Sequence, residues 1–240
     1  MGKPFFSVIV TEHNAAGFMR KGLQSVVEQT FQDFEMIVVC DSCTDNTAEI
    51  AREYIRPETD DRVVEVNFHN SAGSWNTGLD EAKGDWILWM DDDDWYLHEV
   101  AFEMIHEALQ HAKDIDILAY GFYWKGLPEG KRFKMNSRDH LWPAIWNKCW
   151  RREFIGDERF PFWTAAVDYG FAIKMHPKAR FAFLNEQLYF YNFMRKGSES
   201  ERMRNEWHDP DLSDMPEDVQ DATRKYIDAM RTGDLNLVHD

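Results

Sequence analysis

Short apolar runs alternate with stretches of helical periodicity through the first half of the chain. Four apolar runs predict strands at residues 5–10, 36–40, 63–66 and 86–90, and the first, second and fourth are expected to be buried. The segments between these runs place apolar residues at helical spacing, and they predict helices at residues 18–30, 44–55 and 75–82, the last after a turn at 70–73. Strands that alternate with helices predict an α/β fold with a mainly parallel sheet and right-handed crossovers.

The alternation continues for one more helix and strand and then lapses. Residues 100–111 predict an amphipathic helix, and residues 115–120 predict a strand. The later elements are expected to be a hairpin after Trp124, an aromatic stretch at 140–150, a helix at 165–175, strands at 181–184 and 188–193, and a helix at 216–230. We therefore predict one domain over residues 1–200, divided into halves at 1–95 and 96–200, with a helical tail at 201–240.

Composition and charge narrow the classes of partner. The 240 residues are enough for one sizeable α/β domain. The formal net charge of −16 argues against nucleic acid as a partner, because that affinity comes largely from Lys and Arg. The same charge opposes an anionic ligand, so a phosphorylated ligand would need a bound cation or local basic residues.

Targeting signals and cysteines add little. The apolar run near the N-terminus is too short for a signal peptide, and no run approaches the length of a membrane span, so the cytoplasm is the expected location. Three cysteines do not make a disulfide framework. Cys40 and Cys43 form a C-x-x-C pair, for which a structural role is favoured over a redox or zinc site, because only Cys149 remains elsewhere.

Four consecutive carboxylates, Asp91 to Asp94, directly follow the apolar run at 86–90. Open α/β sheets bind ligands at the carboxyl ends of their strands. Two carboxylates about 5 Å apart repel by roughly 3 kcal/mol at an effective dielectric constant near 20, so a run of four is costly unless water or a cation neutralises it. A solvated acidic turn is the alternative, but the position after a buried strand favours a site for Mg²⁺ or Mn²⁺.

Several segments of the chain are more informative together, through their order and spacing, than any one of them is alone. They are SVIVTEHN at 7–14, QTFQDFEMIVVCDSCTDNT at 29–47, NSAGSWNTGLDEAKGDWILWMDDDDW at 70–95, WNKCWRREF at 146–154 and the region of Asp168. Over most of residues 4–200 the chain resembles the family 2 glycosyltransferases of the GT-A fold. The resemblance implies a Rossmann-like sheet, a nucleotide-sugar-binding half at 1–95 and an acceptor half at 96–200.

The resemblance also implies a set of donor-binding residues. Thr11 and His13 match positions that line the nucleotide base, and Asp41 matches the carboxylate that accepts the ring N–H of the base. A carboxylate selects uracil or guanine over cytosine, and UDP is the first choice. Asp93 matches the residue that binds the metal, and Asp91 matches a contact to the ribose or to a metal-bound water, although a register that uses Asp92 and Asp94 stays open.

Asp168 is the candidate general base, because it matches the Asp of the family's Glu-Asp pair. The alternative is a structural role, in which the dipole of the helix at 165–175 stabilises the charge of Asp168. The chain departs from the family pattern at Glu12 and His13, where Thr and Tyr are frequent, and also at Trp75, Val167, Asn192 and Met194, with Arg195 and Lys196 near the last two as substitutes. Packing is favoured over acceptor binding for five aromatic residues, which are Trp142, Trp146, Trp150, Phe162 and Trp163.

These features predict a metal-dependent inverting glycosyltransferase that uses Mn²⁺ or Mg²⁺ to move a sugar from a nucleotide-sugar donor to a carbohydrate acceptor in polysaccharide synthesis. A nucleotide-sugar-binding protein without turnover is one alternative, motivated by the departures. A sugar nucleotidyltransferase is another, but residues 11–17 lack the Gly-rich basic loop that it would need. Peripheral attachment to the inner face of the membrane stays open, as does the oligomeric state.

Overall fold

In the computed structural model, the described residues are 2–125, 131–133, 144–163 and 167–192, together with 195, 196, 198, 201, 213, 215–217, 220, 221, 224 and 225. Within them a single sheet has the strand order β3-β2-β1-β4-β8-β6-β9-β5, with β7 paired to β6. Its strands are β1 Phe6–Glu12, β2 Phe34–Asp41, β3 Arg62–Val66, β4 Trp86–Met90, β5 Trp95–Tyr96, β6 Ile117–Trp124, β7 Lys131–Phe133, β8 Lys148–Arg151 and β9 Phe181–Tyr191.

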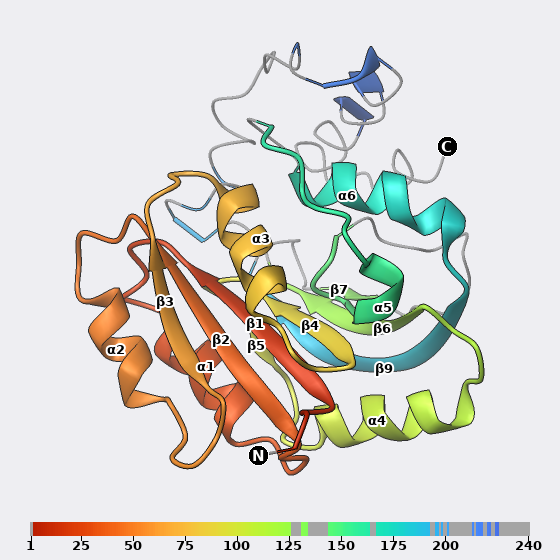
Figure 1. Cartoon of the computed structure of the whole chain (residues 1–240), viewed down its shortest axis with the longest axis horizontal. Coiled ribbons are helices and arrows are strands. Elements are labelled where there is room, and N and C mark those ends of the chain that lie inside the picture. Colours follow the sequence, from red (N-terminus) through yellow and green to blue (C-terminus); the bar gives the residue numbers. More distant parts are fainter. Residues whose placement is uncertain are drawn as a thin grey trace.

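Helices cover this sheet in the alternating order that the sequence predicts. They are α1 Arg20–Val27, α2 Thr47–Glu53, α3 Ser71–Glu81, α4 Ala101–His111, α5 Arg152–Ile155 and α6 Val167–Met175, and a 3₁₀ turn spans His176–Lys178. Figure 1 shows α3 crossing the front of β1 and β2, with α1 behind the sheet. Gly78 permits the close contact of α3, because a Cβ there would lie 2.3 Å from Cγ2 of Ile9.

The sheet confirms the α/β class and differs between its halves. Strands β1 to β4 are mutually parallel. Strand β8 then runs antiparallel to both β4 and β6, while β9 is parallel to β6, so the second half is mixed. Strands β1, β2 and β4 are almost entirely buried, which explains why each appears as a continuous apolar run in the sequence.

Two predicted boundaries are wrong. Residues 181–184 and 188–191 of the two predicted segments belong to one strand, β9, which continues through the exposed Asn185 and Glu186 and carries an irregular register against β6 near Gly121. Residues 71–73 belong to α3 instead of a turn, because the side chain of Asn70 accepts a hydrogen bond from the Ala72 N–H and begins the helix there. Most of the predicted helix at 216–230 lies outside the described residues.

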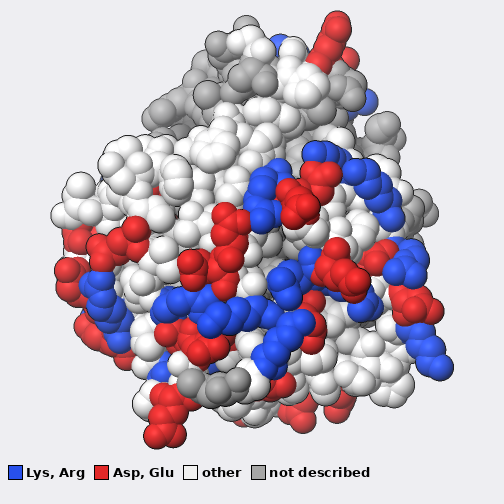
Figure 2. Space-filling view, in the orientation of Figure 1, with Lys and Arg blue, Asp and Glu red and all other residues white. Residues whose placement is uncertain are grey.

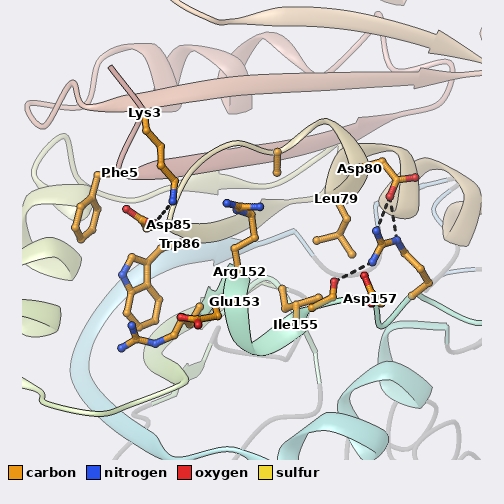
Figure 3. Close-up of a pocket in the computed structure, with 14 residues that line it drawn as sticks. Lys3, Phe5, Leu79, Asp80, Asp85, Trp86, Arg152, Glu153, Ile155 and Asp157 are labelled. Carbon is orange, nitrogen blue, oxygen red and sulfur yellow. Dashed lines mark hydrogen bonds and ion pairs between the residues drawn. The ribbon is translucent and has the colours of Figure 1, made fainter. Parts of the chain in front are cut away.

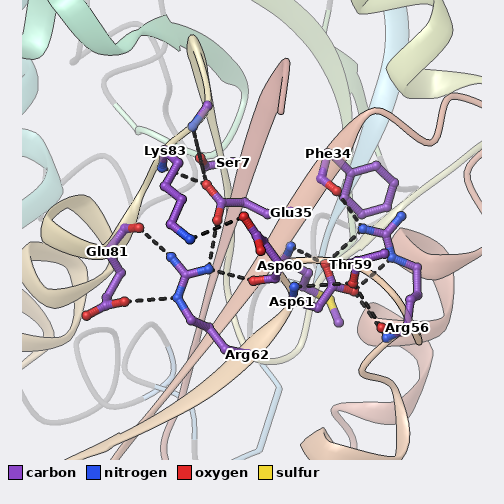
Figure 4. Close-up of polar contacts among 12 residues, drawn as sticks. Ser7, Phe34, Glu35, Arg56, Thr59, Asp60, Asp61, Arg62, Glu81 and Lys83 are labelled. Carbon is purple, nitrogen blue, oxygen red and sulfur yellow. Dashed lines mark hydrogen bonds and ion pairs between the residues drawn. The ribbon is translucent and has the colours of Figure 1, made fainter. Parts of the chain in front are cut away.

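The amino-terminal edge of the parallel strands is fixed by two buried acids (Figure 4). Glu35 accepts hydrogen bonds from Ser7 Oγ at 2.7 Å, from the Lys83 and Gly84 N–H groups at 2.6 and 3.2 Å, and from Arg62 Nη1 at 2.7 Å. Asp61 likewise accepts from the Met36 N–H and from the guanidinium of Arg56, each at 2.8 Å. These bonds tie β1, β2, β3 and the turn before β4 together.

Candidate active site

The candidate site lies at the opposite edge, where the carboxyl ends of β1, β2 and β4 meet. Parallel pairing sets Val10 beside Met90 and Glu12 beside Cys40, so residues just beyond these strands share one edge. Asp91 directly follows β4. The backbone of Asp94 packs closely on α1, because a Cβ on Gly22 would lie 2.6 Å from the Asp94 carbonyl oxygen. We call Asp91–Asp94 and Glu12 the acidic edge.

Within the acidic run, Asp94 is buried and the side chain of Asp93 is 10% exposed. The side chain of Asp94 accepts a hydrogen bond from the Asn192 N–H at 2.7 Å through Oδ1, while Oδ2 is buried without a hydrogen-bond partner among the described residues. Burial, reinforced by the charges of Asp93 and Asp91, raises the pKa of Asp94 well above its usual range. Burial also raises the pKa of Asp93, against the opposing effect of the nearby Arg195.

Arg195 supplies the positive charge at the acidic edge. Its Nε donates to Asp93 Oδ2 at 2.6 Å, and its Nη2 lies 3.8 Å from Asp92 Oδ1. The guanidinium also lies over the ring of Phe18, 3.7 Å from the centroid. The resemblance suggests Arg195 as a substitute for a residue of the family pattern. Nothing in the sequence, however, indicates that Arg195 would lie against Asp92 and Asp93.

Glu12 is an acid of this edge that the sequence analysis did not select. It is 2% exposed, and its Oε2 has no hydrogen-bond partner among the described residues. Burial, followed by the charges of Asp92 and Asp93, raises the pKa of Glu12 well above its usual range. Its position at the end of a buried strand was the available signal, since that is where a polar residue first reaches the ligand-binding edge.

The acidic edge suits a hard divalent cation. Among the described residues there is no group of three or more His, Cys, Asp or Glu side chains arranged to hold a metal by themselves. Mg²⁺ is usually held by one or two carboxylates together with substrate phosphates, so a complete protein cage is not required. The buried Asp94 oxygen and the Arg195 cation held by Asp93 both indicate an edge that attracts positive charge. The residues present therefore fit such an ion.

Asp41 organises the loop between β3 and α3. Its Oδ1 accepts hydrogen bonds from the Phe68 and His69 N–H groups at 2.7 and 3.1 Å, and its Oδ2 accepts from the Asn70 N–H at 3.0 Å. The hydroxyls of Ser42 and Ser74 donate to it as well. Burial alone would raise the pKa of Asp41, but these hydrogen bonds lower it below its usual value. The predicted contact with a base stays a prediction.

Thr11 and His13, two further predicted nucleotide-binding residues, lie at the carboxyl end of β1, which pairs with β2. His13 is exposed, and its Nδ1 lies 2.7 Å from the Asp41 carbonyl oxygen, so this nitrogen carries the proton and donates. The hydroxyl of Thr11 accepts a hydrogen bond from Trp75 Nε1 at 3.1 Å. Trp75, one of the departures from the family pattern, thus braces a predicted base-binding residue while its ring packs on Phe160.

The cysteines near this loop are structural in character. Cys40 and Cys43 are free, and burial raises the pKa of both thiols. The thiol of Cys43 donates to the Glu12 and Asp41 carbonyl oxygens at 3.6 and 3.8 Å. Neutral thiols are poor nucleophiles and metal ligands, which agrees with the structural interpretation of the C-x-x-C pair.

Asp168 lies in the first turn of α6 and is half-buried. The ammonium of Lys148, a fully buried residue of β8, donates to the Ala144 carbonyl at 2.6 Å and to Asn147 Oδ1 at 2.7 Å. Burial lowers the pKa of Lys148, whereas the charge of Asp168 raises it, so the two side chains interact electrostatically. Val167, where the family has Glu, is buried in the core.

The aromatic residues of the second half divide into two groups. Trp146 and Trp150 are buried in the core, as the packing interpretation predicts. Phe162 is 61% exposed, with its ring 6.3 Å from that of Phe68. Trp142 and Met194 lie outside the described residues.

A pocket of 790 Å³ lies at the far edge of the sheet from the acidic edge (Figure 3). Its charged lining comprises Lys3, Arg151, Arg152, Arg159, Asp80, Asp85, Glu153 and Asp157. Arg159 Nη2 pairs with Asp80 Oδ1 at 2.6 Å, and Lys3 pairs with Asp85. Figure 2 shows basic and acidic side chains interleaved over this face. This pocket lies at the amino ends of the parallel strands, whereas open α/β sheets bind ligands at the carboxyl ends, so the candidate site remains the acidic edge.

Comparison with solved structures identifies the fold class. The structure of TarS 1–349 from Staphylococcus aureus in complex with UDP-GlcNAc matches 95% of this chain and 73% of its own, with a TM-score of 0.70 and 21% identity. The mannosyltransferase PcManGT from Pyrobaculum calidifontis, in complex with GDP-Man and Mn²⁺, matches 84% of this chain and 61% of its own, with a TM-score of 0.66 and 19% identity. The sheet and its acidic edge therefore define a GT-A fold.

The sequence comparisons then place the chain in a family. The model described as "Glycosyl transferase family 2" matches residues 7–169, so the chain belongs to that family. The glycosyltransferase GlyA of Streptococcus pneumoniae is 25% identical over an alignment of 226 residues that covers 84% of this chain and 32% of GlyA. The poly(ribitol-phosphate) beta-N-acetylglucosaminyltransferase TarS of Staphylococcus aureus is 27% identical over 98% of this chain and 42% of TarS. The chain thus spans about a third to two-fifths of these two relatives.

A membrane-spanning helix is not found in the part of the chain that the structure describes.

Proposed function

We propose that this chain is a metal-dependent inverting glycosyltransferase that moves a sugar from a UDP-sugar to a carbohydrate acceptor in polysaccharide synthesis, with the cytoplasm as its place of action. The observation that carries the proposal is the acidic edge, in which carboxylates that follow β4 already hold a cation, the guanidinium of Arg195. Relatives and neighbours support it, since their names or titles include UDP-GlcNAc and Mn²⁺.

In this proposal the donor lies along the carboxyl ends of β1, β2 and β4. Asp93 and Asp91 hold Mn²⁺ or Mg²⁺, which would offset the charge of the donor diphosphate and stabilise the leaving group. Thr11 and His13 line the base, with Asp41 shaping the neighbouring loop and accepting the ring N–H of uracil. The metal explains how a chain of net charge −16 could bind an anionic donor.

Asp168 is proposed to act as the general base. Its carboxylate takes the proton of an acceptor hydroxyl as that oxygen attacks the anomeric carbon from the face opposite the diphosphate. The new bond joins the acceptor oxygen to the sugar, while the bond to the diphosphate breaks and UDP leaves with its electron pair. Burial lowers the pKa of Lys148 and the charge of Asp168 opposes that effect, so a protonated Lys148 and an ionised Asp168 would favour each other.

Thermal unfolding with added ligands tests the donor site. UDP is expected to raise the unfolding temperature only when Mn²⁺ is present, because the metal joins the acidic edge to the diphosphate. Asp93→Ala should abolish the shift. Asp85→Ala, at the other end of β4 and exposed in its pair with Lys3, is the matched control and should retain it. Equal stabilisation by CDP, or by UDP without metal, would contradict the proposal.

Turnover separates the enzyme from a binding protein. UDP release from a UDP-sugar is expected with Mn²⁺, and Asp168→Asn should slow it by about 10²-fold or more, because general base catalysis contributes about that much. Asp157→Asn, in the pocket at the far edge, should leave the rate unchanged. If UDP plus Mn²⁺ stabilises the wild type but no UDP is released from any UDP-sugar, the alternative without turnover is correct.

A further inference from the structure

The guanidinium of Arg195 occupies a built position at the acidic edge. Asp93 accepts from its Nε at 2.6 Å, Asp92 lies 3.8 Å from its Nη2, and the Lys196 carbonyl lies 3.3 Å from its Nη1. The Phe18 ring lies below it at 3.7 Å, and only 22% of the side chain is exposed. Contacts from several sides hold this group more firmly than a surface ion pair.

This arrangement sets Arg195 against a divalent metal. The carboxylate that accepts its shortest hydrogen bond is Asp93, to which the proposed function assigns the metal. A guanidinium and a dication a few ångströms apart repel each other, and a metal bound at Asp93 Oδ2 would draw on the electron pairs that accept the Arg195 hydrogen bond. The two cations therefore cannot use Asp93 in full at the same time.

The rest of the acidic edge explains why a resident cation is needed. Glu12 and Asp94 are each almost completely buried, and each has an oxygen without a hydrogen-bond partner among the described residues. Negative charge gathered in a medium of low dielectric constant is unfavourable unless a cation lies close by. Arg195 supplies this positive charge by pairing with Asp93.

We propose that Arg195 is the resident counter-cation of the acidic edge, and that a divalent metal must displace it from Asp93. Displacement frees the guanidinium, whose planar fork matches phosphate oxygens, to pair with the donor diphosphate. Metal and nucleotide then bind cooperatively. The metal frees Arg195 to pair with the diphosphate, and the diphosphate gives the displaced guanidinium a new partner. This inference rests on the proposed function. It adds that the metal binds weakly when no nucleotide is present.

Calorimetric titration of Mn²⁺ into the nucleotide-free protein tests the exchange without relying on activity. Arg195→Met keeps the apolar stem over Phe18 and removes the competing charge. It should bind Mn²⁺ about tenfold more tightly than the wild type, the size expected when one charge-assisted hydrogen bond no longer competes. Lys196→Met removes the same charge from the adjacent, exposed position and should change the affinity by less than about twofold.

Repeating the titration with saturating UDP completes the test. UDP should tighten Mn²⁺ binding strongly in the wild type and less in Arg195→Met, because that variant has lost both the competitor and the phosphate partner. Arg195→Lys, which keeps the charge without the fork, should fall between them. Each variant must first show the same folded circular dichroism spectrum as the wild type.

The outcomes separate the two proposals. Equal or weaker Mn²⁺ binding by nucleotide-free Arg195→Met, with UDP and Mn²⁺ still binding together to the wild type, would overturn the exchange and leave the proposed function intact. No Mn²⁺ binding to any variant, with or without UDP, would overturn both. Tighter binding in Arg195→Met alone, with Lys196→Met unchanged, establishes the exchange.

Discussion

Two buried aspartates of this protein, Asp41 and Asp94, show how the surroundings of a carboxylate decide its character. Asp41 receives hydrogen bonds from three backbone N–H groups and two hydroxyls, and the pKa of its carboxyl is lowered despite burial. Asp94 receives a backbone bond from Asn192 but keeps one oxygen without a partner among the described residues, and its pKa is raised. The first is a structural anion, and the second belongs to an edge that attracts cations.

Asp41→Asn is therefore expected to lower the free energy of unfolding by about 2–4 kcal/mol at pH 7, because an amide cannot accept all of these charge-assisted bonds. Urea denaturation measures this loss. The difference from wild type should be complete above about pH 4, the unfolded-state pKa, and should shrink as the pH falls through the lower folded-state pKa.

Asp33→Asn, at an exposed position before β2, is the control for this experiment and should be neutral. A loss for Asp41→Asn that stayed constant down to pH 2 would show that the charge of Asp41 has no part in it.

At the scale of elements, the two edges of the parallel strands have separate tasks. The amino-terminal edge is closed by Glu35 and Asp61, each bonded to backbone N–H groups and to an arginine (Figure 4). The carboxyl edge carries Glu12 and Asp91–Asp94. Because the strands between the edges are rigid and buried, a change at the first edge should affect stability without altering ligand binding at the second.

Glu35→Gln tests this separation. The amide would turn a donor toward Arg62 or toward the N–H groups of Lys83 and Gly84, and we expect a loss of about 2–4 kcal/mol in the free energy of unfolding. Glu81→Gln removes an exposed acid from the same Arg62 and should cost less than about 1 kcal/mol. The rise in unfolding temperature on adding UDP and Mn²⁺ should be equal in both variants, and a smaller rise in Glu35→Gln would show that the edges are coupled.

The first half of the molecule was more predictable from sequence than the second, for a physical reason. Strands β1, β2 and β4 are buried on both faces, so their residues are apolar throughout and their ends are marked by polar residues. Strand β9 is only partly buried and includes the exposed Asn185 and Glu186, which in sequence look like a break between two strands. Asp91–Asp94 could be selected because the run follows a buried strand directly.

Contacts between distant parts of the chain could not be predicted. Asp93 and Arg195 are 102 residues apart, and Asp94 and Asn192 are 98 apart, so no local pattern joins them. Glu12 was missed because a single acid at the end of a strand is usually solvated, and only the packing of β1 beside β4 brings it to the other acids. Lys148 lies in the segment at 146–154 that carries part of the resemblance. Its burial and its interaction with Asp168, however, depend on the place of β8 in the sheet.

At the scale of the whole molecule, one sheet joins both halves. Strand β8 connects the parallel strands to β6 and β9, and the end of β9 returns to pair with β5 directly after the acidic run. Figure 1 shows β9 curving beside β6 from α6 toward β5. The predicted division at residue 95 therefore describes two regions of one sheet, and the predicted boundary at residue 200 stays a prediction.

The return of β9 has a consequence for how the protein is made. The ribosome releases Asp91–Asp94 about a hundred residues before Arg195, and at about 5–20 residues per second this interval lasts roughly 5–20 s. During that interval the nascent chain holds four adjacent carboxylates without the arginine that later pairs with Asp93 and lies near Asp92. Folding of the first half can start at β1 to β4, but the ligand-binding edge acquires its final charge balance only when translation has passed the last strand.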